Sequence, residues 1–108
     1  MLSHATIEQA ARCLVRNAQS PAQVILFGSY ARGEATEDSD LDLLVVEQEL
    51  PDPTSEYLRL RRALGSLGVG VDLLLYSKNE FERRRDWCGT PIYWAVREGR
   101  ILHESTAG

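Results

Sequence analysis

Apolar residues recur along the 108-residue chain at two spacings, and each spacing predicts a different element. Over residues 7–18 they return at every third or fourth position, which predicts an amphipathic helix with Thr6 and Gln9 as a capping box at its start. Three later runs are short, apolar and bounded by turn residues, as buried strands are. These runs are residues 24–27, 41–46 and 69–76.

Cap and turn residues predict the helices between and after these strands. Ser29 is expected to cap a short helix that Gly33 limits. A longer helix should begin near residues 52–55 with Pro53 in its first turn. Residues 79–86 are polar and are expected to be helical.

The C-terminal segment predicts one more helix. Thr90 is its expected cap and Pro91 its first position, and Gly99 ends it. The aromatic Trp94 within it is interpreted as core packing, with a partner interface as the alternative. Residues 100–103 are either a short strand or a tail.

The alternation of helices and strands predicts an α/β (α+β) fold in which helices flank a small mixed β-sheet. The length suits a single domain over residues 1–108. With 12 basic and 16 acidic residues the net charge is −4, which argues against direct nucleic-acid binding. Neither a membrane-length apolar run nor a signal peptide is apparent, so we expect a cytoplasmic protein that does not act in the membrane.

Acidic residues interrupt two of the predicted strands. Side chains of a strand alternate between its faces, so Asp40 and Asp42 share one face and Leu41 points to the other. Neighbouring carboxylates at the start of an apolar strand repel each other, and a bound divalent cation would relieve that repulsion. Asp72 interrupts the third strand in the same way and joins this face if the two strands pair. Alternatively, Asp72 ends a strand or caps a turn.

A glycine and a serine follow the first predicted strand. Gly28 would let the backbone approach a phosphate closely, and Ser29 adds a hydroxyl donor. The helix that follows offers free N–H groups to an anion. Arg32, one turn further on, would reach the same phosphates or pair with a nearby acid. Gly-Ser, ten intervening residues and then Asp-x-Asp together predict a site for a nucleotide and Mg²⁺.

Residues 28–43, from Gly28-Ser29 through Asp40-Leu41-Asp42-Leu43, resemble the signature of the DNA polymerase β-like nucleotidyltransferase superfamily. The short chain is similar to its minimal nucleotidyltransferases, which are often encoded beside a HEPN-domain partner as toxin–antitoxin pairs. The resemblance implies the polymerase β-like nucleotidyltransferase fold over this chain.

The resemblance also implies a role for each residue. Gly28 and Ser29 would hold the triphosphate, with Arg32 as a secondary candidate for stabilising its charge. Asp40 and Asp42 would bind two Mg²⁺ ions, and Asp72 would bind one of them and help to activate the attacking hydroxyl.

The expected activity is Mg²⁺-dependent transfer of a nucleoside monophosphate, AMP from ATP, to a hydroxyl group. The resemblance implies that the acceptor is a tyrosine of a HEPN toxin, which would make this chain an antitoxin. A nucleotide-binding antitoxin that masks its partner by contact alone is the first alternative. The second is a small-molecule (aminoglycoside-like) nucleotidyltransferase, which would need an acceptor-binding surface from elsewhere, such as a homo-oligomer.

Overall fold

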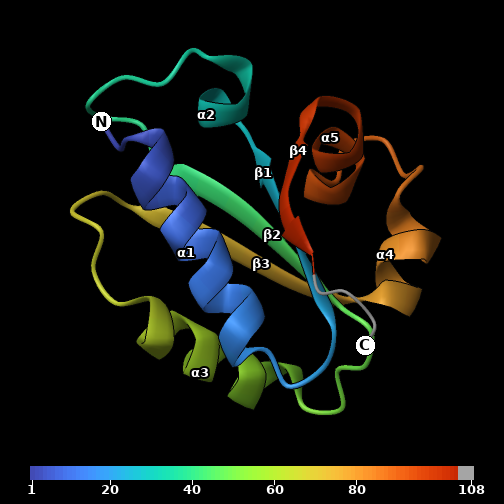
Figure 1. The fold of residues 1–108 in the computed structure, drawn as a ribbon. Coiled ribbons are helices and arrows are strands. Elements are labelled where there is room, and N and C mark those ends of the chain that lie inside the picture. The colour runs from blue at the N-terminus through green and yellow to red at the C-terminus, as the bar shows by residue number, and fades with distance from the viewer. Residues whose placement is uncertain (105–108) are drawn as a thin grey trace.

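A computed structural model describes residues 1–104 of the chain (Figure 1). Five helices and four strands alternate along these residues. They are α1 (His4–Asn17), β1 (Ala22–Phe27), α2 (Ser29–Arg32), β2 (Leu41–Glu47), α3 (Pro53–Leu64), β3 (Val71–Ser77), α4 (Lys78–Arg84), α5 (Pro91–Glu98) and β4 (Arg100–Glu104). The predicted order of elements is therefore confirmed, and residues 100–104 form a strand.

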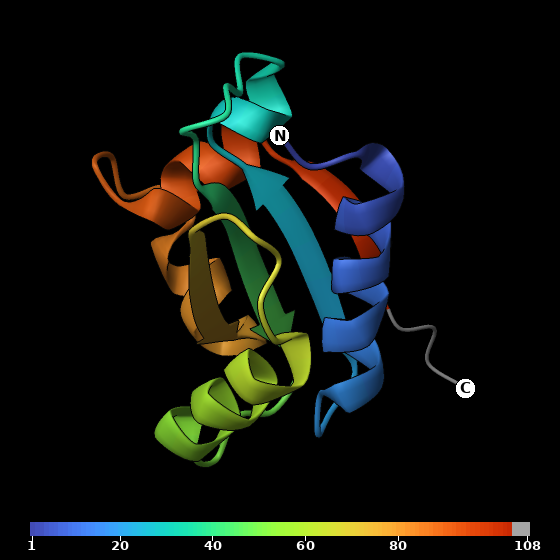
Figure 2. The ribbon, with the colours of Figure 1, turned by 90° about the vertical axis from the view of Figure 1, so that its left-hand side faces the viewer.

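The four strands form one mixed sheet in the order β3-β2-β1-β4. Strand β1 runs antiparallel to both β2 and β4, whereas β2 and β3 are parallel. Figure 2 shows β3 at one side of the sheet, beside β2. The predicted fold class, a small mixed sheet with flanking helices, is confirmed.

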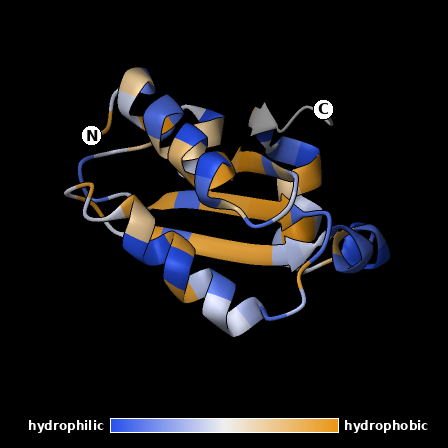
Figure 3. Ribbon diagram, turned by 60° about the horizontal axis from the view of Figure 1, so that its bottom comes forward, coloured by the Kyte–Doolittle hydropathy of each residue, from blue (hydrophilic) through white to orange (hydrophobic). Residues whose placement is uncertain are grey.

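Each face of the sheet has its own apolar core. The β2 residues Leu41, Leu43 and Val45 pack with α1 and α3 on one face. Leu44 and Val46 pack with α4 and α5 on the other face. The central parts of the strands are accordingly apolar and appear orange in Figure 3. This period of two decides on which face the acidic residues of β2 emerge.

The helix starts agree with the predicted caps in two cases and differ in two. Asp52 and Thr90 cap α3 and α5, each followed by a proline at the start of the helix. At α1 the capping box is wrong, because the Ser3 hydroxyl accepts the Thr6 N–H at 3.2 Å and the helix begins earlier than predicted. At α2 the cap is Gly28 and not Ser29, which is the first residue of the helix.

Within residues 1–104, none of the helices combines the length and the hydrophobicity that crossing a lipid bilayer requires.

Candidate active site

Gly28 forms the turn after β1 and allows the backbone there to lie close to neighbouring atoms. Its backbone angles, φ 75° and ψ −155°, lie in a region that essentially only glycine occupies. A Cβ at this position would overlap the Oδ2 atom of Asp42. The backbone between β1 and α2 therefore lies directly against a β2 carboxylate, and glycine is the residue that permits it.

The three candidate carboxylates lie on the same face of the sheet. In the parallel β2–β3 pair, Asp42 stands opposite Asp72. Asp40 precedes β2 and its carboxylate lies against Gly70, where a Cβ would overlap it. The Leu41 N–H donates to the Gly70 carbonyl at 2.8 Å and fixes this register. The condition under which Asp72 joins Asp40 and Asp42, pairing of the two strands, is met.

Crowding of these acids changes the protonation of Asp42. Burial, followed by a hydrogen bond to Asp72 and the negative charges of Asp72 and Asp40, raises the pKa of Asp42 to about 6. The Arg32 charge acts in the opposite direction and is the smallest of these influences. Below this pH a proton is therefore shared between the two adjoining carboxylates and reduces their repulsion.

The donor set fits a hard divalent cation. Carboxylate oxygens are the ligands that Mg²⁺ prefers, and a cation beside Asp42 and Asp72 would replace the shared proton. As the side chains lie, the described part of the chain holds no group of three acidic, histidine or cysteine residues arranged around one ion. The structure therefore brings Asp42 and Asp72 together directly, and places Asp40 on the same face over Gly70.

Arg32 is engaged by two acids. Its Nε lies 3.0 Å from Glu34 and its Nη1 lies 3.3 Å from Glu98 of α5. Hydrogen bonds to Glu34 and then to Glu98 raise the pKa of the Arg32 guanidinium. The sequence left phosphate binding and pairing with an acid open for Arg32, and the structure shows the pairing.

Two adjoining cavities border this site. One, of about 490 Å³, is lined by Gly28 and Arg32 together with α5 residues that include Trp94. The other, of about 360 Å³, contains Asp42 and Asp72. Both share Phe27 and Pro91 in their walls. The phosphate-binding turn and the carboxylates thus open into neighbouring spaces.

The interpretation of Trp94 as core packing is wrong. Trp94 is 49% exposed and lines the larger cavity, because Ile92 and Ala95 form the buried stripe of α5 and Trp94 lies off that stripe. The Tyr93 ring meets the Trp94 ring edge-on at 5.3 Å. Helical spacing already separates Trp94 from Ile92 and Ala95, and this signal could have identified it as a surface aromatic.

Comparison with known proteins shows the family to which the chain belongs. Residues 7–95 match the family model described as the nucleotidyltransferase domain. The chain therefore belongs to the nucleotidyltransferase domain family, and the predicted enzyme class is confirmed.

Relatives and solved structures narrow this class. A Methanocaldococcus jannaschii chain named as a protein adenylyltransferase, MJ0604, is 34% identical over 83 residues, which cover 75% of this chain and 77% of that protein. The protein adenylyltransferase MntA of Thermococcus cleftensis is 45% identical over 56 residues, covering 51% of this chain and 56% of MntA. The match thus spans little more than half of MntA.

A solved structure named as a minimal nucleotidyltransferase is 35% identical, with a TM-score of 0.61 over 89% of each chain. A toxin–antitoxin crystal structure with AMP-PNP has a TM-score of 0.64 at 22% identity, covering 92% of this chain and 74% of that one, and shows the same fold. With the family match, these similarities identify the chain as a minimal nucleotidyltransferase, the group that its sequence resembles.

Proposed function

We propose that this chain transfers AMP from ATP to a hydroxyl group of a protein, and that the acceptor is a tyrosine of a HEPN-domain toxin whose activity the transfer abolishes. The observation that carries the proposal is the placement of Asp42 and Asp72 opposite each other, directly beside the Gly28 turn. Support for the acceptor class comes from the names of MJ0604 and MntA. The toxin–antitoxin neighbour with AMP-PNP supports a nucleotide and a toxin partner.

The residues divide the reaction between them. Gly28 and Ser29 would hold the triphosphate at the turn after β1, where glycine lets the backbone approach the phosphates closely. Asp40, Asp42 and Asp72 would hold Mg²⁺, which neutralises phosphate charge and lowers the barrier to displacement at phosphorus. Arg32, which lies on the same cavity, would exchange its acidic partners for phosphate oxygens.

The transfer step is an in-line displacement. The tyrosine oxygen attacks the α-phosphorus of ATP and forms the new oxygen–phosphorus bond. The bond from the α-phosphorus to the bridging oxygen breaks, and pyrophosphate leaves with that electron pair. The phenolic proton passes to the Asp72 carboxylate, which is exposed, and from there to water.

The test is transfer of label from α-labelled ATP to a purified HEPN-domain protein encoded beside this chain. Asp42→Asn should reduce transfer at least a hundredfold. Asp38→Asn is the matched control, because Asp38 is an exposed acid of the preceding loop, and it should transfer as the wild type does. Undiminished transfer by Asp42→Asn would overturn the site assignment. Neutralisation of the toxin without transfer would favour an antitoxin that masks its partner by contact.

A further inference from the structure

The outer edge of β3 is open and apolar. Strand β3 ends the sheet on one side, and within residues 1–104 no other strand pairs with its outer side. Its sequence, VDLLLYS, contains a single charged residue and neither proline nor glycine. An apolar edge without these protective features is a template for pairing with another extended chain.

The register of the sheet shows which backbone groups this edge presents. The Gly70 carbonyl accepts from β2, and backbone groups of successive residues point to alternate sides of a strand. Leu73 and Leu75 therefore direct their N–H and C=O groups away from β2. The carbonyl of Val71, which also faces outward, accepts a hydrogen bond from Arg61 Nη1 at 2.8 Å. An added strand could therefore form backbone hydrogen bonds with Leu73 and Leu75, whereas at Val71 the Arg61 side chain already occupies the carbonyl.

Two cavities with shared walls lie along this edge and lead to the carboxylates, and we refer to them together as the groove. A cavity of about 320 Å³ is lined by β3 residues and by Tyr57 of α3. The cavity of about 360 Å³ that contains Asp42 and Asp72 shares Tyr57, Leu73 and Leu74 with it. Because a strand advances about 3.3 Å per residue, Leu75 lies about 10 Å along the groove from Asp72. A strand paired at Leu75 would therefore reach the carboxylates within a few residues.

We propose that an extended segment of the acceptor polypeptide adds to the β3 edge as a further strand and thereby delivers its hydroxyl side chain to Asp72. This inference rests on the proposed function and identifies where the acceptor binds. Backbone pairing supplies affinity, and side chains at alternate positions of the segment fall on the same face, which supplies specificity. An acceptor segment is favoured over a second copy of this chain because the cavity along the β3 edge shares its walls with the cavity that contains Asp42 and Asp72.

The transfer test uses a pool of synthetic decapeptides with one fixed tyrosine and randomised flanks, supplied with α-labelled ATP and Mg²⁺. The critical variant is Leu75→Pro, which removes the outward N–H but no hydrogen bond to β2. Leu75→Ala is its matched control, since both variants lose the leucine side chain. Leu75→Pro should lower kcat/KM for the labelled peptides about tenfold relative to Leu75→Ala, while the Kd for ATP stays within about twofold.

A second measurement needs no variant. In the wild-type protein, hydrogen exchange of the Leu73 and Leu75 amides should slow when a labelled peptide is added, as a newly paired strand requires. Equal kinetics of the two Leu75 variants, unprotected amides, or transfer to a whole protein but to no peptide would overturn the inference. A dimer that Leu75→Pro dissociates would assign the edge to a second copy. Failure of the wild-type chain to bind ATP would instead overturn the proposed function itself.

Discussion

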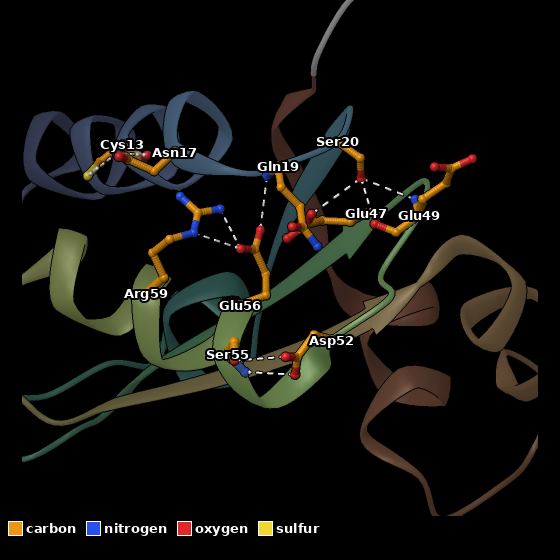
Figure 4. Close-up of polar contacts among 10 residues, drawn as sticks. All are labelled: Cys13, Asn17, Gln19, Ser20, Glu47, Glu49, Asp52, Ser55, Glu56 and Arg59. Carbon is orange, nitrogen blue, oxygen red and sulfur yellow. Dashed lines mark hydrogen bonds and ion pairs between the residues drawn. The ribbon is translucent and has the colours of Figure 1, made fainter.

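Two glutamates are buried together at the end of the sheet remote from the candidate active site (Figure 4). Glu47 of β2 is 0% exposed and Glu56 of α3 is 2% exposed. Glu56 accepts the Gln19 N–H at 3.0 Å and is paired with the Arg59 guanidinium, whereas Glu47 accepts from Ser20, whose hydroxyl lies at 3.3 Å, and has no cationic partner within residues 1–104. Glu47, the carboxyl without a cationic partner, therefore retains its proton and shares it with Glu56 in a hydrogen bond.

This arrangement links folding to pH with a definite sign. Burial, then the hydrogen bond to Glu56, raises the pKa of Glu47 from 4.5 to about 8. Between these values the folded chain binds a proton that the unfolded chain has released, so the free energy of unfolding falls as pH rises. The slope for one proton is at most about 1.4 kcal/mol per pH unit. We expect a loss of roughly 2 kcal/mol between pH 5.5 and 7.5.

Glu47→Gln isolates this contribution, because the amide keeps the shape and a donor to Glu56 but does not titrate. Urea unfolding followed by circular dichroism at pH 5.5, 6.5 and 7.5 should show a steep decrease in stability for the wild type and a much shallower one for this variant, in which the raised pKa of Asp42 leaves a smaller dependence. Glu49→Gln, at an exposed acid just beyond β2, should retain the wild-type slope. The lowered pKa of Glu56 acts below this pH range. Equal slopes for wild type and Glu47→Gln would refute the shared-proton interpretation.

Three further predictions concern the candidate active site. Gly28→Ala should lower the stability of the folded chain by about 1–3 kcal/mol through backbone strain and should abolish AMP transfer. Gly33→Ala is its control: an added Cβ there meets nothing within 4 Å, so this variant should lose only about 1 kcal/mol of stability and keep its transfer activity. Equal transfer by both variants would contradict the turn geometry. Trp94→Ala should weaken ATP binding about tenfold in a calorimetric titration, because Trp94 lines the cavity beside Gly28 and Arg32. Trp87→Ala, at an exposed tryptophan outside that cavity, should leave the Kd unchanged. An unchanged Kd for both variants would exclude this cavity as part of the nucleotide site. Millimolar Mg²⁺ should stabilise the wild type by about 1 kcal/mol in thermal unfolding but not Asp42→Asn, and an identical shift in both would place the cation elsewhere.

The features that could be predicted from the sequence are those that depend on the pattern of neighbouring residues. The period of two in β2 was sufficient to place Asp42 on the face opposite Leu41 and Leu43. Asp72 needed one assumption, that β3 pairs beside β2, and the register confirms it. The two prolines at helix starts were equally local signals, because proline fits the first turn wherever the helix packs.

What the sequence could not provide depends on contacts between distant segments. The Arg32–Glu98 ion pair joins residues 66 positions apart, and no spacing rule connects them. Glu47 is the last residue of β2. Its burial becomes a proton-sharing pair only because α3 brings Glu56 against the end of β2. Packing of α3 and α5 on the sheet, and not the pattern within either helix, creates both features.

Strand direction explains why the candidate site assembles where it does. Because β1 is antiparallel to β2, the residue that follows β1, Gly28, meets the start of β2. Because β3 is parallel to β2, its own start lies at the same end and brings Asp72 opposite Asp42. The turn and the carboxylates are therefore fixed by three neighbouring strands alone. The position of α5, which forms one wall of the cavity beside Gly28, is not fixed by these strands. Substitutions in α5 should therefore change nucleotide affinity while the Asp42–Asp72 pair stays in place.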